Sequence, residues 1–508
     1  MRAPSSTFVP PAVAALAVAA ACVLTACGSG TSQSAVAATT TRVGPSASCG
    51  TARAYAITDA GTVAWAVKLP GAPQDSIPQP VALDGVAVFA NGNVLSARRL
   101  AGGRQVWQLT YPTAAGSSTR PAGGPVEAGT GSSAGDVAGL WAWHGELIVV
   151  VATFGLSDQD LDMRVQALNP ATGAVRWTAD LGRGDLYNQM EITANGVLAL
   201  ITEQGGSDGE GRLLAVGLNA GRLLWSRSYG KQDETDGPDV VGPVIVMASG
   251  GAVTGFDAST GAVLWSHGRM PSGVGSVAGP GGSVLLYDIL QGTDPPQAPP
   301  AASKLFPVTA LNAVTGAVLW RAKTAGAVSQ LSAADGLIVV GTSQPYQLTV
   351  LTPGGHVAWS VTDYLPNPMS WMESGSDLVY VSSEPDAQGP GIEAGLTMVT
   401  DRRLSTGSVR WSIRLADFAA GDAVVRPDGR NLVVTGRPLQ GESAGLLAAD
   451  PATGAVRAQV LVGAVAISAP VTAGGDTLLQ AGAACIVPGP RSAAGPVAGG
   501  SATIDNHP

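Results

Sequence analysis

The chain has 508 residues, of which 13% are Asp, Glu, Lys or Arg, and glycine (68) with proline (35) makes up about a fifth of it. This composition favours many short strands joined by tight turns over a helix-rich fold. The net charge of −9, with no cluster of Lys and Arg, excludes the basic surface of a nucleic-acid-binding protein.

Residues 1–27 have the pattern of an export signal. Arg2 supplies the early positive charge, and an uninterrupted apolar run, too short to span a bilayer, extends from Ala12 to Val23. The sequence Leu-Thr-Ala-Cys at 24–27 has the small-residue pattern of a bacterial lipobox, which predicts cleavage before Cys27 and acylation of that cysteine. The alternative is an ordinary cleaved signal with a chance cysteine.

The segment that follows the signal, residues 28–48, is rich in Ser, Thr, Ala and Gly and is predicted to be a flexible tether. Of the four cysteines, Cys22 leaves with the signal and Cys27 carries lipid, so one pair remains, Cys49 and Cys485. In an oxidising compartment a disulfide between them would clamp both ends of the repeat region, contributing about 3–5 kcal/mol. Two unpaired thiols are the alternative.

A repeated hairpin dominates the rest of the chain. Nine times a glycine stands four residues before a hydrophobic position, and tryptophan occupies eight of the nine. The segments 165–177, 253–265 and 308–320 each have a short strand, an Asn or Asp, a Thr-Gly turn and a second strand that ends in the tryptophan. The tryptophans are Trp65, Trp107, Trp177, Trp225, Trp265, Trp320, Trp359 and Trp411, and Ala458 takes the ninth position.

Further short apolar strands precede the hairpins, so each unit supplies the four strands of a propeller blade. The sequence therefore predicts an all-β propeller over residues 49–487, in which each tryptophan covers a neighbouring sheet and strands from both ends close the ring. Eight blades are preferred, with seven to nine compatible, because the unit at 80–109 is expected to be irregular. Residues 112–136 and 291–303 are predicted surface loops, and 488–508 a disordered tail.

The pattern of an apolar strand, Asn or Asp, Thr-Gly, two residues and Trp resembles the repeat of the PQQ-type quinoprotein propellers. Together with the lipobox, this repeat makes the chain similar to the non-enzymatic BamB-like lipoproteins. The resemblance implies a role as a scaffold in the assembly of membrane proteins. The enzymes of this fold have two adjacent cysteines over the quinone and carboxylate and Asn ligands for calcium. Adjacent cysteines do not occur in this sequence. We therefore expect no cofactor, no metal and no catalytic residues.

Other candidate motifs have simpler interpretations. Two Gly-x-Ser-x-Gly strings lack the strand-to-helix context of a nucleophile, and the histidines lack paired metal-ligand spacing. Two acidic segments are interpreted as hydrated turns, although the first suggests calcium ligation and the second could meet a basic partner. Three tryptophans outside the repeat are expected to pack in strands. These residues are Ser133 and Ser443; His144, His267, His356 and His507; Asp158, Asp160 and Asp162; Asp233, Glu234, Asp236 and Asp239; and Trp141, Trp143 and Trp371.

The sequence thus predicts a monomeric, lipid-anchored propeller on the extracytoplasmic side of the cell membrane, which binds or scaffolds an unidentified envelope protein. Two alternatives stay open. One is a quinoprotein dehydrogenase, active or degenerate, and the other is a sensor or carbohydrate-binding propeller of the cell wall.

Overall fold

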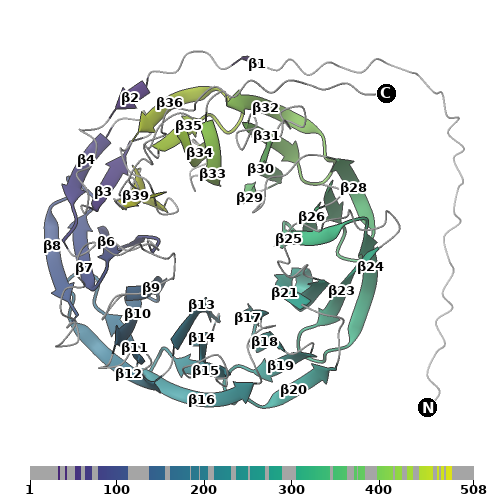
Figure 1. Cartoon of the computed structure of the whole chain (residues 1–508), viewed down its shortest axis with the longest axis horizontal. Helices are drawn as coiled ribbons and strands as arrows, with labels where there is room; N and C mark the ends of the chain where they lie inside the picture. The colour runs from purple at the N-terminus through teal and green to yellow at the C-terminus, as the bar shows by residue number, and fades with distance from the viewer. Residues whose placement is uncertain are drawn as a thin grey trace, which may run out of the picture. The chain divides into compact units, whose positions relative to one another are not determined.

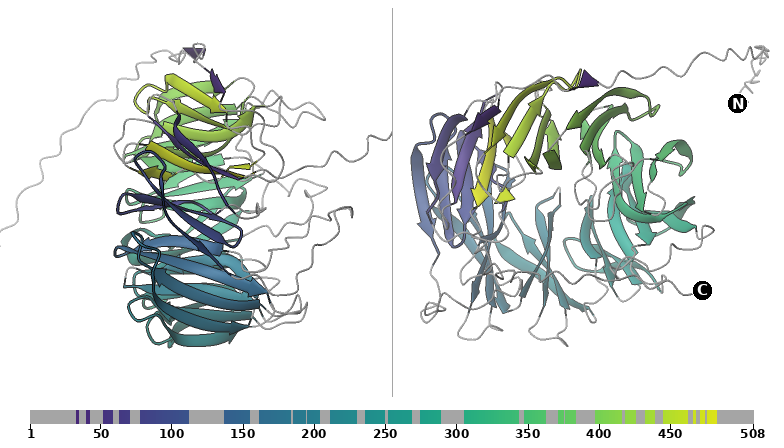
Figure 2. Two further views of the ribbon diagram at one scale, coloured as in Figure 1. Left: turned by 90° about the vertical axis from the view of Figure 1, so that its left-hand side faces the viewer. Right: turned by 45° about the horizontal axis from the view of Figure 1, so that its top comes forward.

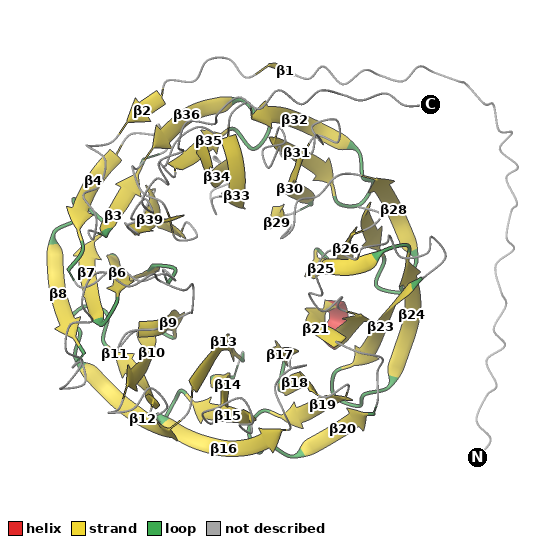
Figure 3. Cartoon of the chain, viewed as in Figure 1, coloured by secondary structure: helices red, strands yellow, loops and turns green. Residues whose placement is uncertain are grey.

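The described part of the chain is built almost entirely from strands. The computed structural model describes residues 33–34, 40–42, 52–58, 63–70, 78–111, 137–154, 161–183, 185–193, 195–203, 211–229, 236–249, 252–268, 274–288, 305–343, 347–362, 371–374, 376–383, 397–415, 418–425, 432–438, 445–461, 466–467, 471–473 and 476–482. One short 3-10 turn, η1 (Pro280–Gly282), interrupts the strands of these segments (Figure 3).

Eight sheets, which we name blades B to I, each contain four consecutive strands that pair antiparallel in sequence order. Blade B has β5 (Val81–Leu83), β6 (Val86–Asn91), β7 (Val94–Arg99) and β8 (Gln105–Thr110); blade C has β9 (Val137–Trp143), β10 (Glu146–Phe154), β11 (Leu161–Leu168) and β12 (Val175–Arg183). Blade D has β13 (Asp185–Ile192), β14 (Val197–Glu203), β15 (Gly211–Gly217) and β16 (Arg222–Tyr229); blade E has β17 (Asp236–Val241), β18 (Val244–Ser249), β19 (Ala252–Asp257) and β20 (Val263–His267). Blade F has β21 (Val274–Gly279), β22 (Ser283–Asp288), β23 (Phe306–Asn312) and β24 (Val318–Thr324); blade G has β25 (Ala327–Ala334), β26 (Leu337–Ser343), β27 (Gln347–Leu351) and β28 (Val357–Thr362). Blade H has β29 (Trp371–Ser374), β30 (Asp377–Ser383), β31 (Thr397–Arg403) and β32 (Val409–Leu415); blade I has β33 (Phe418–Val425), β34 (Leu432–Pro438), β35 (Gly445–Ala449) and β36 (Val456–Leu461).

A ninth sheet, blade A, combines strands from both ends of the chain. Its N-terminal strands are β3 (Arg53–Ile57) and β4 (Val63–Lys68), and β3 pairs antiparallel with β39 (Asp476–Gly482) from the C-terminal part of the chain. The short strands β37 (Ala466–Ile467) and β38 (Val471–Ala473) also pair with β39. The described residues therefore form nine sheets, at the upper end of the expected range, with eight of them made from consecutive strands. The expectation that residues 80–109 are irregular is wrong, because β5–β8 form an ordinary four-stranded sheet.

The sheets are arranged radially, which confirms the all-β propeller (Figure 1). The first strand of each sequential sheet lies nearest the centre and the fourth lies at the periphery. Figure 2 shows the same sheets from the side. Two short strands from the segment 28–48 add to the periphery in parallel orientation: β1 (Gln33–Ser34) pairs with β32, and β2 (Thr40–Arg42) pairs with β36.

The middle strands of the blades are buried on both faces because a sheet stacks against each side of them. All six residues of β6 are buried, and Val244 to Ala248 in β18 are also buried. The cores lie between blades: one cluster joins Val88 and Trp107 of blade B to Leu147 and Val149 of blade C. Stacking on both faces explains why these strands are continuous apolar runs rather than alternating ones.

The repeated turn has the same hydrogen bonds in four blades. Its first residue is an Asn or Asp whose Oδ1 accepts hydrogen bonds from the backbone N–H groups two and three residues later, and the glycine four residues later donates its N–H to the same residue's carbonyl oxygen at 2.7–2.8 Å. That glycine has φ of 68–72°, which disfavours other residues. The residues that begin these turns are Asn169, Asp257, Asn312 and Asp450.

Each repeat tryptophan lies on the outermost strand of its blade and contacts the turn glycine of the next blade. A Cβ atom on Gly316 would lie 2.5 Å from Cγ of Trp265, so the indole needs a glycine there. The same contact joins Trp65 to Gly103, Trp107 to Gly173, Trp177 to Gly221, Trp225 to Gly261, Trp320 to Gly355, Trp359 to Gly407 and Trp411 to Gly454. In seven of the eight, the indole Nε1 donates to a carbonyl oxygen of that turn at 2.6–2.8 Å.

Candidate functional site

The strand order gives the blades two unlike ends. Turns between first and second strands and between third and fourth strands lie at one end, which we call the turn end; it is closed by tight turns such as Asp84-Gly85 and Asp335-Gly336. The other side of the blades, which we call the connection end, holds the strand termini that the longest connections join. These connections are residues 112–136, 289–304 and 384–396. Recognition residues concentrate on long connections supported by a rigid scaffold. These connections lie outside the described residues.

The described histidines are distributed over separate blades. His144 stacks on Trp143, with ring centroids 4.1 Å apart, and a ring nitrogen of His267 lies 2.7 Å from the carbonyl oxygen of Gly316. His356 lies in the turn between β27 and β28. Within the segments that the structure describes, no group of three or more His, Cys, Asp or Glu side chains is placed to hold a metal ion. His507 and both Gly-x-Ser-x-Gly serines, Ser133 and Ser443, lie outside the described residues.

Two carboxylates link the innermost strands of neighbouring blades. Glu191 of β13 accepts a hydrogen bond from the backbone N–H of Val240 in β17 at 2.9 Å, and Asp239 of β17 accepts one from the hydroxyl of Ser276 in β21. Partial desolvation raises the pKa of Glu191, and the Val240 hydrogen bond opposes that rise. Both carboxylates therefore have protein partners and connect blades D, E and F.

The structure divides the two acidic segments singled out in the sequence. Asp162 belongs to β11 and Asp236 to β17, whereas Asp239 takes part in the link to β21. The remaining members, Asp158, Asp160, Asp233 and Glu234, lie outside the described residues. Sequence reasoning missed Glu191 and Ser276, because their partners are 49 and 37 residues away.

The additional tryptophans of blade C pack between sheets. Trp143 contacts Gly196 in the first turn of blade D, where a Cβ atom would lie 2.7 Å from the indole, and Trp141 covers Gly139 of its own strand. Both are partly buried against the core shared by blades C and D. Trp371 lies in β29. We find in these contacts a structural role for Trp141 and Trp143.

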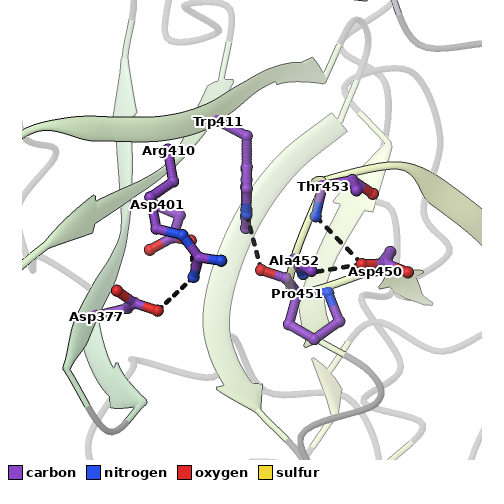
Figure 4. A network of polar contacts seen from close by, with 8 residues as sticks. All are labelled: Asp377, Asp401, Arg410, Trp411, Asp450, Pro451, Ala452 and Thr453. Atoms are coloured by element: carbon purple, nitrogen blue, oxygen red, sulfur yellow. Dashed lines mark hydrogen bonds and ion pairs between the residues drawn. The ribbon is translucent and has the colours of Figure 1, made fainter.

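A buried carboxylate distinguishes blade H (Figure 4). Asp401 pairs with Trp411 across β31 and β32 and is 1% exposed, whereas the corresponding residue in the other blades is Ala, Gly or Val. Arg410 donates to Asp377 and lies 3.3 Å from Oδ2 of Asp401, while Oδ1 of Asp401 has no hydrogen-bond partner. Burial, followed by the charge of Asp377, raises the pKa of Asp401 to about 6, and Arg410 opposes this rise.

The position of Arg410 explains this contact. The strand ladder shifts register between Asp401 and Arg402, so the residue directly before the tryptophan is an extra one that can turn back over the sheet. In blade C the equivalent residue, Arg176, makes the equivalent ion pair with Glu146 at 2.7 Å. The sequence signal for the site was an Asp in a repeat position that otherwise carries small or apolar residues.

The residues predicted for export and cross-linking, Cys27, Cys49 and Cys485, lie outside the described residues, as do the signal segment 1–27 and the tail 488–508. A search of the described segments finds no helix with the length and hydropathy needed to cross a bilayer.

Radial sheets of four antiparallel strands, joined by tryptophan and glycine contacts, define a β-propeller built from one repeated unit. The profile of the family described as outer membrane protein assembly factor BamB matches residues 161–290 and 307–437, about half of the sequence. The chain therefore belongs to this family, and the predicted PQQ-type repeat is confirmed. Comparison with curated proteins finds no match.

Several solved propellers are similar in fold. BamB from Moraxella catarrhalis is 16% identical, with 71% of this chain and 91% of that chain covered and a TM-score of 0.36. The quinohemoprotein alcohol dehydrogenase from Comamonas testosteroni is 12% identical, with 80% and 74% covered and a TM-score of 0.41. The computationally designed Ika8 protein is 14% identical, with 72% and 94% covered and a TM-score of 0.44. These similarities concern the fold and carry no argument about activity.

Proposed function

We propose that this protein is a lipid-anchored propeller of the cell envelope that binds another envelope protein and does not catalyse a reaction. Membership of the BamB family supports the protein-binding part. The lipobox pattern at residues 24–27 supports an anchor at Cys27 on the extracytoplasmic side. The observation that carries the proposal is the combination of a rigid propeller with long connections that all join strands at one end.

Three carboxylates among the described residues have protein partners, which is consistent with a scaffold. Glu191 and Asp239 accept hydrogen bonds between inner strands, and Asp377 pairs with Arg410. The sequence lacks the adjacent cysteines that enzymes of this fold hold over the quinone. The residues present do not match that cofactor, so we derive no step through it.

Affinity capture from envelope membranes tests the binding function. The full-length protein should enrich one or a few envelope proteins over an unrelated lipoprotein carrying the same anchor. If capture by this protein and by that control is indistinguishable, the scaffold proposal is wrong.

The anchor needs a separate measurement. The mature protein should begin at Cys27 and carry the mass of acyl chains, and Cys27→Ala should abolish both processing and membrane retention. A mature chain that begins elsewhere and lacks lipid would refute the anchor without touching the binding function.

A further inference from the structure

Exposed large hydrophobic side chains are concentrated in two adjacent blades, and four of them lie on the outermost strands, which we call the rim. Of the ten such residues among those the structure describes, six belong to blades E and F: Val263, Leu264, Leu305, Val314, Val318 and Leu319. A concentration of exposed apolar side chains of this kind often marks an interaction site in soluble domains. Except for residues 291–306, blades E and F lie within the segments that match the family profile.

The local sequence accounts for part of this exposure, and blades E and F share the same four residues there. Both have Ala-Val-Leu-Trp at the start of the outermost strand, so two apolar residues precede the tryptophan. Val263 and Leu264 are 54% and 41% exposed, and Val318 and Leu319 are 40% and 54% exposed. In blades C and H the residue directly before the tryptophan is an arginine that binds an acidic residue of its own blade. The rim of blades E and F lacks that polar cover.

The outermost strands of other blades show what such an edge can accept. Among the described residues β24 is the edge strand of its sheet, whereas β36 is extended by the parallel strand β2 (Figure 1). Thr40 to Arg42 lie beside Gln459 to Leu461, which are the first to third residues after the repeat position 458. The pairing of β1 with Ile413 and Arg414 of β32 falls in the same register. This fold therefore accepts an added parallel strand at that place on the rim.

We propose that the outer edge of β24 binds an extended strand of a partner protein, added in parallel at the register that β2 uses on β36. The residues of β24 equivalent to Gln459 and Leu461 are Arg321 and Lys323, and both are exposed. A parallel strand then meets Val318 and Leu319 first and the two cations afterwards. A partner segment that matches this edge has apolar residues followed by acidic ones. Backbone hydrogen bonds to β24 and the opposite charges would hold it there. This inference rests on the proposed binding function, and it specifies the chemistry of the partner.

Charge argues against the N-terminal segment of a second copy as the occupant. Residues 33–42 contain no acidic residue and end in Arg42, which in this register would lie beside Lys323. Like charges placed opposite each other on neighbouring strands are destabilising. The acidic strand of a different protein therefore matches the edge of β24 better than residues 33–42 of a second copy do.

A charge-swap experiment on the full-length protein tests the proposal. The probes are two synthetic peptides with alternating Val and Thr followed by either two Glu or two Lys, each with a photoreactive group. The Glu peptide should bind the wild type about tenfold more tightly than the Lys peptide and cross-link to β24. In the double variant Arg321→Glu and Lys323→Glu the preference should reverse; both residues are exposed, so folding should be retained.

An unchanged preference in the variant, cross-links confined to β32 or β36, or no cross-link at all would each overturn the rim site. Capture from envelope membranes separates this result from the broader proposal. Loss of the captured protein in the charge-swapped chain supports the rim site. Unchanged capture refutes the rim site but leaves the binding function intact, and no capture by either chain refutes the binding function itself.

Discussion

Replacing Gly316 by alanine should loosen the junction between blades E and F. Gly316 has φ of 69°, and a Cβ atom there would lie 2.5 Å from Cγ of Trp265. Gly336 supplies a matched control, because it has φ of 74° but no heavy atom within 4 Å of a built Cβ. Both substitutions cost about 1–2 kcal/mol from the backbone conformation. Only Gly316→Ala also displaces an indole that is 8% exposed and donates to Ala313 at 2.7 Å.

The added cost follows from what the indole loses. One hydrogen bond contributes about 1 kcal/mol, and partial loss of tryptophan packing contributes about 1–3 kcal/mol. Gly316→Ala should therefore be about 2–4 kcal/mol less stable than Gly336→Ala. Urea denaturation followed by tryptophan fluorescence measures the difference, and hydrogen exchange in β20 and β24 locates it. Equal destabilisation by the two substitutions would refute the view that the glycine is needed for close approach of the indole.

The other predictions concern blades H and I and the cofactor. Because the pKa of folded Asp401 lies near 6, above its ordinary 3.8, the folded state binds the proton more readily. Stability should rise by up to about 3 kcal/mol as the pH falls from above the folded pKa to below the unfolded one. Asp401→Asn should remove this gain in denaturation measured across that range, and a pH profile identical to that of the wild type would contradict the assignment. Amide hydrogens of Val456–Leu461, the strand carrying Ala458, should exchange faster than those of Val409–Leu415, which carry Trp411; equal protection would show that the tryptophan contact does not control local opening. Addition of quinone and calcium to the purified protein should give neither a red-shifted chromophore nor alcohol or sugar oxidation, and either signal would overturn the non-catalytic proposal.

Much of the fold could be predicted from the sequence because the residues that form the repeated hairpin are close together in the chain. The turn needs Asn or Asp and a glycine within five positions, as in Asn312 to Gly316, and the tryptophan follows at a fixed distance. The contact across blades is non-local, but repetition makes it predictable. The hydrogen bond between Val240 and Glu191 could not be predicted, because it occurs once and joins residues 49 positions apart. The strand β2 was not predicted either, since Thr-Thr-Arg has no pattern that distinguishes it from a tether.

The exceptions to the repeat are therefore the informative positions, and two of them surround blade I. At its junction with blade H, Asp401 puts a partly unpaired carboxylate where the other blades have a small or apolar residue, next to the contact between Trp411 and Gly454. On its opposite side, Ala458 replaces the tryptophan that would cover the junction with blade A. Blade A is itself joined through the pairing of β3 with β39, which brings together strands from the two ends of the repeat region. An alanine cannot supply the indole that contacts the turn glycine of the next blade at the other eight repeat positions, so that contact is missing from the repeat here. Strand β2, which adds to the edge of β36 at residues 459–461, supplies pairing at that place.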